Sequence, residues 1–343
     1  MALSAAAVAV AATLLLFLYA IGLRLAHMSH DRLKRRIRAD YWPIFAEAVV
    51  SDHFAENTHL PVSVRRHKTQ LLREWCRFRS IIRGSAASNL NTLARRLGLL
   101  EFARKRLTLR ALGGRLLAIQ AVGLLRDRSC WSTLEPLLDQ PNIALSITAA
   151  TSLADIDPER AIPIIIPLVV TKKGWPRTQV GRILNSAGLT IVSRRLCEAI
   201  ETSPLKDAIQ LMRFMDAVST TDVNRLMSEI LDHRDEPELL AAALKVARGH
   251  LSADKVSALA SHDAWYVRMQ AANLLAKFGA PDSIKILEKM LSDTEWWVRY
   301  RAAQAITKLP FLGPNALRRL CDRQADRFAR DIMRQALAER GLA

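Results

Sequence analysis

The most regular hydrophobic pattern in this chain lies in its C-terminal quarter. Apolar residues recur there at intervals of three and four positions, which is the spacing of one face of an α-helix. One stripe consists of Val267, Ala271, Leu275 and Phe278, and a second consists of Val298, Ala302, Ile306 and Leu309. Polar and charged residues fill most positions between them. The pattern therefore predicts amphipathic helices that pack through these stripes, with the alanines allowing close approach.

The two stripes belong to copies of one sequence unit. Residues 263–272 return as residues 293–303, and the matching valine, arginine and alanine positions are 31 residues apart. A period of this length corresponds to one helix-turn-helix unit of an α-solenoid. Weaker copies start at Arg115, Ser146 and Arg177, and degenerate copies lie near residues 207–215 and 239–246. We therefore expect an all-α fold, a right-handed solenoid of about seven helical hairpins that ends in a polar capping helix within residues 322–342.

The other end of the chain is almost uniformly apolar. Residues 2–23 carry no charge, and as a helix they would reach about 33 Å at roughly 1.5 Å per residue, enough to cross a bilayer. Basic residues follow directly: Arg24, Arg32, Lys34, Arg35, Arg36 and Arg38. The positive-inside bias then predicts a single-pass protein of the inner membrane, with its N-terminus outside and its repeats in the cytoplasm. A cleaved secretory signal is the alternative, although no positive region precedes the apolar stretch.

Charge divides the chain into parts. We expect a transmembrane anchor over residues 1–23, a basic juxtamembrane segment with a first helix over 24–60, a basic helical region over 61–112, and the solenoid over 113–343. Residues 1–128 hold 22 Lys and Arg against 8 Asp and Glu, about +14 of the total +17, which leaves about +3 for the rest. The basic excess predicts contact between the six juxtamembrane cations and anionic headgroups, at about 1 kcal/mol per basic residue. A solvated face is the alternative.

Neither the composition nor the motifs of the chain indicate a catalytic, metal or cofactor site. Half of the residues are hydrophobic but only 6% are aromatic, which is typical of packed helices. The four cysteines lie far apart and form no C-x-x-C pair, so neither a disulfide framework nor a zinc site is expected. The sequence contains no phosphate-binding loop, zinc-protease motif or nucleophile elbow. We therefore expect no catalytic residues, no metal, no cofactor and no small-molecule substrate.

The unit that starts at Asp293, with Val298-Arg299 and then Ala302-Ala303, resembles the HEAT repeat, an armadillo-like α-solenoid family. In that family Asp and Arg commonly form a ladder between successive hairpins. The resemblance implies this structural role for Asp263, Arg268, Asp293 and Arg299, although the Asp-to-Val offset is one residue shorter in the Asp263 copy. The layout of anchor, basic stretch and repeats also resembles bacterial membrane-tethered HEAT-repeat proteins, some of which are associated with envelope polysaccharide glycosyltransferases.

Five tryptophans stand near predicted helix starts: Trp131, Trp175, Trp265, Trp296 and Trp297. They pack between hairpins, or they anchor a protein partner, since Trp is enriched among interface hot spots. A third interpretation is nucleic-acid contact, because residues 296–299 are similar to repeats of DNA alkylation-repair glycosylases. Nucleic-acid binding predicts a basic stripe over the repeats, whereas the excess charge lies near the anchor. We therefore expect a membrane-tethered, non-catalytic scaffold that binds protein, with a nucleic-acid-binding protein as the alternative.

Overall fold

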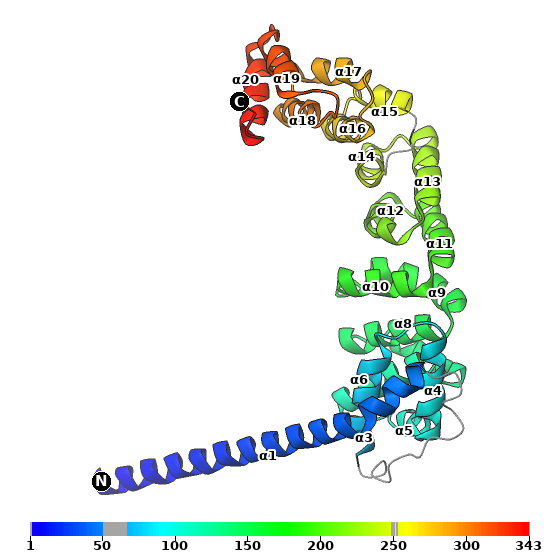
Figure 1. Ribbon diagram of the computed structural model, residues 1–343, viewed down its shortest axis with the longest axis vertical. Helices are drawn as coiled ribbons and strands as arrows, with labels where there is room; N and C mark the ends of the chain where they lie inside the picture. Colours follow the sequence, from blue (N-terminus) through cyan, green and yellow to red (C-terminus); the bar gives the residue numbers. More distant parts are fainter. Residues whose placement is uncertain (1, 51–66, 248–250, 252, 343) are drawn as a thin grey trace. The chain divides into compact units, whose positions relative to one another are not determined.

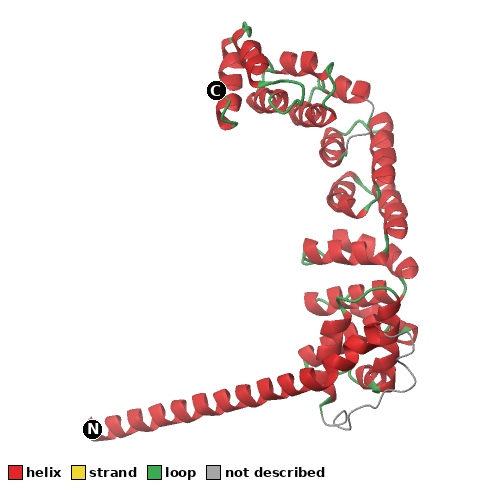
Figure 2. Cartoon of the chain, viewed as in Figure 1, coloured by secondary structure: helices red, strands yellow, loops and turns green. Residues whose placement is uncertain are grey.

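The computed structural model describes residues 2–50, 67–247, 251 and 253–342, and every regular element in these residues is a helix (Figure 2). The chain divides into two compact units, Met1–Asp157 and Pro158–Ala343. The division falls inside the predicted solenoid, between α8 (Ile143–Ile156) and α9 (Pro158–Thr171). Each unit is therefore described separately.

The first unit combines one long helix with a cluster of short ones. Its elements are α1 (Ala2–Val50), α3 (Lys68–Arg79), α4 (Ser85–Arg96), α5 (Leu99–Arg104), α6 (Leu112–Leu124), η2 (Arg128–Cys130), α7 (Trp131–Leu134), η3 (Glu135–Leu137) and α8. Helices α1, α3 and α4 contact one another and enclose a core. Trp75 is fully buried in it, and the indole nitrogen donates to the carbonyl of Leu90 at 3.1 Å. This bond satisfies the one donor of the indole, so the ring is buried without a polar penalty.

The long helix α1 enters this core through its C-terminal part. Tyr41 and Phe45 are buried, and the Phe45 ring lies 5.5 Å from the ring of Phe78 on α3. Pro43 lies in the interior of α1. Within the described part of the chain, no helix combines the length and the apolar character that crossing a bilayer requires. Most side chains of the predicted anchor, those of residues 1–16, 22 and 23, lie outside the described residues.

Helices α6 and α8 pack against each other at very short range. A Cβ atom at Gly123 of α6 would lie 2.6 Å from the Cα of Ser152 on α8. The hydroxyl of Ser152 donates to the carbonyl of Ile119 on α6 at 2.8 Å, which fixes the contact. Helix α6 begins at Leu112.

The second unit is a succession of helical hairpins (Figure 1). Its elements are α9, α10 (Arg177–Ala187), α11 (Leu189–Thr202), α12 (Leu205–Leu211), η4 (Met212–Ala217), α13 (Thr220–His233), α14 (Pro237–Val246), α15 (Ala253–Leu259), α16 (Trp265–Phe278), α17 (Ser283–Met290), α18 (Trp296–Ile306), α19 (Pro314–Asp322) and α20 (Arg327–Glu339). The two helices of each pair contact each other, and the second helix of each pair also contacts that of the next, through η4 in the case of α10. We call α10, α12 with η4, α14, α16, α18 and α20 the inner row.

The predicted copies of the repeat fall on equivalent helices. In the second unit they lie on the inner row: Arg177 on α10, residues 207–215 on α12 and η4, residues 239–246 on α14, Arg268 on α16 and Arg299 on α18. In the first unit, Arg115 lies on α6 and Ser146 on α8. Helix α20, the expected cap, carries a further copy. Arg330 follows Arg299 by 31 positions, and it donates to a carbonyl six residues earlier at 2.6 Å, as Arg299 does at 2.8 Å.

Candidate partner-binding surfaces on the C-terminal repeats

Exposed aromatic side chains mark the starts of the last three helices of the inner row. Trp265 is 37% exposed, Trp296 41%, Trp297 49% and Phe328 68%. The valines that follow in α16 and α18, Val267 and Val298, are fully buried, so the first turn of each helix holds its aromatic residues outside the core. We call Trp265, Trp296, Trp297 and Phe328 the aromatic edge. Large exposed rings that recur on neighbouring repeats are typical of an interaction surface.

Contacts within the aromatic edge fix the position of Trp296. Its ring stacks on Tyr300 at 5.0 Å and meets Trp297 edge to face at 4.8 Å. The Tyr300 hydroxyl donates to Glu339 of α20 at 2.9 Å, and this bond raises the pKa of Tyr300. The aromatic group on α18 is therefore tied to α20. Side chains that are ordered before binding lose less conformational entropy when a partner binds.

The other two tryptophans of the sequence prediction are structural. Trp131 is 5% exposed and Trp175 is 7% exposed, in contrast to the aromatic edge. The indole nitrogen of Trp131 donates to Glu135 at 2.8 Å. The structure therefore separates the five residues: Trp131 and Trp175 are buried by packing, whereas Trp265, Trp296 and Trp297 are exposed.

One Arg–Asp pair joins α16 to the turn before α18. The guanidinium of Arg268 donates two hydrogen bonds of 2.7 Å to the carboxylate of Asp293, and both side chains are nearly buried. Burial opposes the ionisation of Asp293, but the bonds from Arg268 and from the backbone of Glu295 outweigh it and lower the pKa. Arg268 also donates to the carbonyls of His262 and Asp263. This geometry ties one repeat to the next.

The ladder does not continue through the other two residues implied by the resemblance. Arg299 donates to the carbonyls of Asp293 and Thr294 and lies 5.9 Å from the ring of Phe328. The structural reason is the register. The residue six positions before Arg268 is His262, not Asp263, and the residue six positions before Arg330 is Gln324. Asp263 therefore binds Arg268 only through its backbone carbonyl. In the next repeat, Gln324 stands at the position equivalent to Asp293, so Arg299 has no carboxylate there to bind.

A second Arg–Asp pair, which the sequence analysis did not find, lies in the first unit. Arg104 at the end of α5 binds Asp127 through bonds of 2.7 and 3.0 Å. Asp127 also accepts from the thiol of Cys130 at 3.1 Å. Burial is the main cause that raises the pKa of the Cys130 thiol to about 11, and the bond to Asp127 is the second. Cys130 is therefore protonated at neutral pH and is not an activated nucleophile. In the sequence, this pair is marked only by Asp127, which stands in the short turn before η2.

The four cysteines and the acidic residues form no site for a metal among the residues that the structure describes. Cys76, Cys130, Cys197 and Cys321 are buried and unbridged. No group of three or more His, Cys, Asp and Glu side chains in those residues is arranged to hold an ion.

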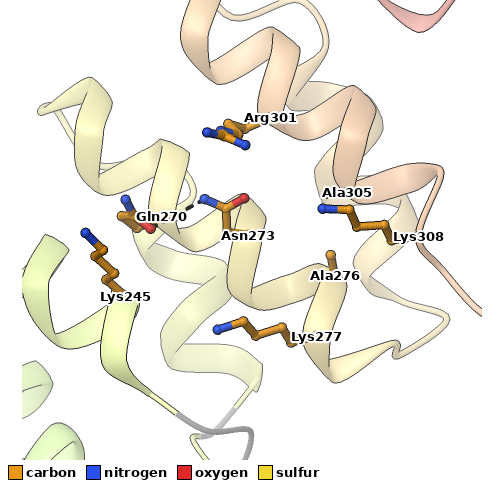
Figure 3. Close-up of a pocket in the computed structure, with 8 residues that line it drawn as sticks. All are labelled: Lys245, Gln270, Asn273, Ala276, Lys277, Arg301, Ala305 and Lys308. Carbon is orange, nitrogen blue, oxygen red and sulfur yellow. Dashed lines mark hydrogen bonds between the residues drawn. The ribbon is translucent and has the colours of Figure 1, made fainter. Parts of the chain in front are cut away.

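A basic hollow lies on the inner row, between α14, α16 and α18 (Figure 3). Its volume is about 440 Å³, and four cationic side chains line it together with two amides. They are Lys245, Lys277, Arg301, Lys308, Gln270 and Asn273. A second hollow, of about 640 Å³, shares Lys245 and Lys277 and extends toward α10 and η4. Neither hollow is evident from the sequence, because most of these cations lie near the ends of different repeat helices and are far apart along the chain.

The six predicted membrane-surface cations differ in their contacts. Arg24, Arg32, Arg35 and Arg36 are exposed on α1. Lys34 pairs with Asp31 on the same helix at 3.2 Å, and Arg38 pairs with the buried Glu74 of α3 at 2.8 Å. Arg38 therefore has a structural partner, and the other four arginines are more open to a surface ligand.

These observations define an all-α solenoid whose helices repeat in pairs. Residues 253–339 match the family model of HEAT repeats, so the C-terminal repeats of this all-α solenoid are HEAT repeats. Two similar solved structures are an engineered protein (16% identity, 86% of this chain and 88% of that chain, TM-score 0.32) and human deoxyhypusine hydroxylase in complex with glycerol (15%, 82% and 98%, 0.31). Among curated proteins, none matches the sequence.

Proposed function

We propose that this HEAT-repeat protein is a non-catalytic scaffold that binds a protein partner through the aromatic edge. The observation that carries the proposal is the recurrence of exposed rings at the starts of α16, α18 and α20. Interface hot spots are enriched in tryptophan and arginine and are surrounded by residues that exclude water. The aromatic edge supplies the rings, and Arg299 lies beside Phe328.

The membrane tether is a further part of the proposal and rests on the sequence of residues 2–23. The uncharged stretch and the cations that follow it favour an uncleaved anchor with the repeats in the cytoplasm. The partner class that we propose is a membrane-associated enzyme complex. The sequence resemblance suggests an envelope polysaccharide glycosyltransferase as the candidate within that class.

The aromatic edge is tested by a crosslinked pull-down from native membranes. The double variant Trp297→Ala and Phe328→Ala should lose the partner that the unmodified chain captures, with binding weakened about 30-fold, because two exposed anchors are removed. The variant should keep its fold, since both side chains are exposed. Mass spectrometry of the captured proteins gives the readout.

The matched control is Phe311→Ala. Phe311 is 43% exposed and lies beyond the other end of α18. Its removal should leave capture unchanged. Equal capture by the unmodified chain, the double variant and the control would refute the aromatic edge as the binding surface.

The tether predicts that the full-length chain stays with the membrane during carbonate extraction. Its N-terminal peptide should begin at Met1 or Ala2, because the anchor is not cleaved. Release into the supernatant, or an N-terminus near Ala26, would contradict the tether. Protease digestion of sealed inverted vesicles, which expose the cytoplasmic face, should degrade the repeats.

A further inference from the structure

A row of cations runs along the inner row of the second unit, one from each of four successive repeats. Its members are Arg213 on η4, Lys245 on α14, Lys277 on α16 and Lys308 just after α18. They follow one another at intervals of 32, 32 and 31 residues, the period of the fold. All four line the two hollows that share Lys245 and Lys277. We call this row and the hollows around it the basic groove.

The four cations of the row form no salt bridge with the described residues, although one carboxylate, Asp216, also lines the larger hollow. Arg213, Lys245, Lys277 and Lys308 are exposed. Some cations elsewhere in the second unit are paired: Lys255 binds Asp232, Arg234 binds Glu236, and Arg225 binds Glu229. Cations therefore outnumber acids in the lining of the two hollows, with Asp216 as its one carboxylate. Such an excess of one sign concentrates positive potential and attracts anions.

Polar side chains that are not fully satisfied lie beside the row. The Nε of Arg301 is buried and has no hydrogen-bond partner among the described residues. Asn273 and Gln270, which line the same hollow, hold each other through one bond of 3.4 Å. Side-chain amides both donate and accept, so they match the backbone of an extended peptide.

The lining favours a peptide over a nucleic acid. The remaining wall of the larger hollow includes Ile209, Met212, Met215 and Val246, and no aromatic side chain lines either hollow within the described residues. Single-stranded nucleic acids bind to stacked aromatic platforms, which this surface lacks. Aliphatic walls accommodate the apolar side chains of a peptide.

The spacing of the cations sets a periodicity for the ligand. Packed helices lie about 8–10 Å apart, and an extended chain advances about 10 Å over three residues. A peptide that follows the inner row would therefore meet one cation with every third residue. We propose that the basic groove binds an extended acidic segment of a protein partner, with Asp or Glu at every third position. This inference rests on the proposed function, because it gives the chemistry of a segment of the protein partner.

The test is fluorescence anisotropy of the full chain with two labelled peptides of twelve residues. Both contain four Glu, four Ala and four Ser, but one has Glu at every third position and the other has the four Glu in one block. The periodic peptide should bind about tenfold more tightly, and binding should weaken as salt rises. Equal affinity for the two peptides, or no binding, overturns the inference.

Charge reversal locates the site. The double variant Lys245→Glu and Lys277→Glu should weaken binding of the periodic peptide about tenfold or more. Lys285→Glu with Lys289→Glu changes two exposed lysines of α17 that line neither hollow, and it should leave the affinity unchanged. Equal losses in the two variants would show a general charge effect and overturn the assignment. Circular dichroism checks that both variants fold.

Two further outcomes separate this inference from the proposed function. Tighter binding of a labelled oligothymidine than of the periodic peptide would overturn the peptide assignment in favour of nucleic acid. If partner capture depends on the aromatic edge but the peptides do not bind, only the proposal for the basic groove is refuted. If the groove binds the periodic peptide but the aromatic-edge variant still captures the partner, only the proposal for the aromatic edge is refuted.

Discussion

Arg268→Ala is expected to destabilise the C-terminal repeats by about 3 kcal/mol, because it leaves the nearly buried carboxylate of Asp293 without its partner. The same change at Arg299 is expected to remove about 1 kcal/mol, since that side chain bonds only to carbonyls in the described contacts. The two arginines occupy the same position of successive repeats. The difference between the two variants therefore measures the contribution of the Arg268–Asp293 ion pair to stability. Urea denaturation of the full chain, with hydrogen exchange over α16 and α18, measures both effects.

The pH dependence gives an independent check on the same pair. The pKa of Asp293 in the folded chain lies below its ordinary value of 3.8. The pair therefore stabilises the fold fully above that ordinary value, and the stabilisation is lost as pH falls through the lowered pKa. The stability difference between the unmodified chain and Arg268→Ala should shrink in acid, as Asp293 becomes protonated. A difference that is the same at neutral and at strongly acidic pH, or an equal loss in Arg299→Ala, would contradict this account.

The hydrophobic pattern contained enough information to predict the helices of the repeat. Val267 and Val298 are fully buried as expected, because burial of one apolar stripe per helix is the main requirement of a solenoid. The ladder was not predictable in detail. A one-residue difference in the turn before α16 places His262 where Asp293 stands before α18, and such offsets decide which groups meet.

The candidate surfaces show a different limit of sequence reasoning. Trp131 and Trp265 both stand at helix starts, yet one is buried and the other exposed. Exposure depends on which neighbouring helices cover the first turn, and a local pattern does not contain that information. The basic groove was missed for a related reason. Its cations are far apart in sequence, and the low net charge of the repeats averages them with the acidic residues of the same repeats.

Gly123→Ala should destabilise the first unit by about 2 kcal/mol, although alanine is normally the better helix former. The new methyl group would lie 2.6 Å from the backbone and side chain of Ser152, so α6 and α8 would have to separate. Overpacking of this kind costs about 1–3 kcal/mol, and more where backbone must move. Separation would also stretch the bond from Ser152 to the Ile119 carbonyl. Thermal or urea unfolding of the full chain measures the loss.

Gly181→Ala is the control, because this glycine lies within α10 and a Cβ there would meet nothing within 4 Å. Alanine should stabilise that helix by about 1 kcal/mol, since it reduces the conformational freedom of the unfolded chain. The two substitutions are identical in chemistry and are expected to act in opposite directions. A stabilised Gly123→Ala variant would show that α6 and α8 are less closely packed than the structure indicates. A loss of similar size in both variants would mean that the close approach at Ser152 is not the cause.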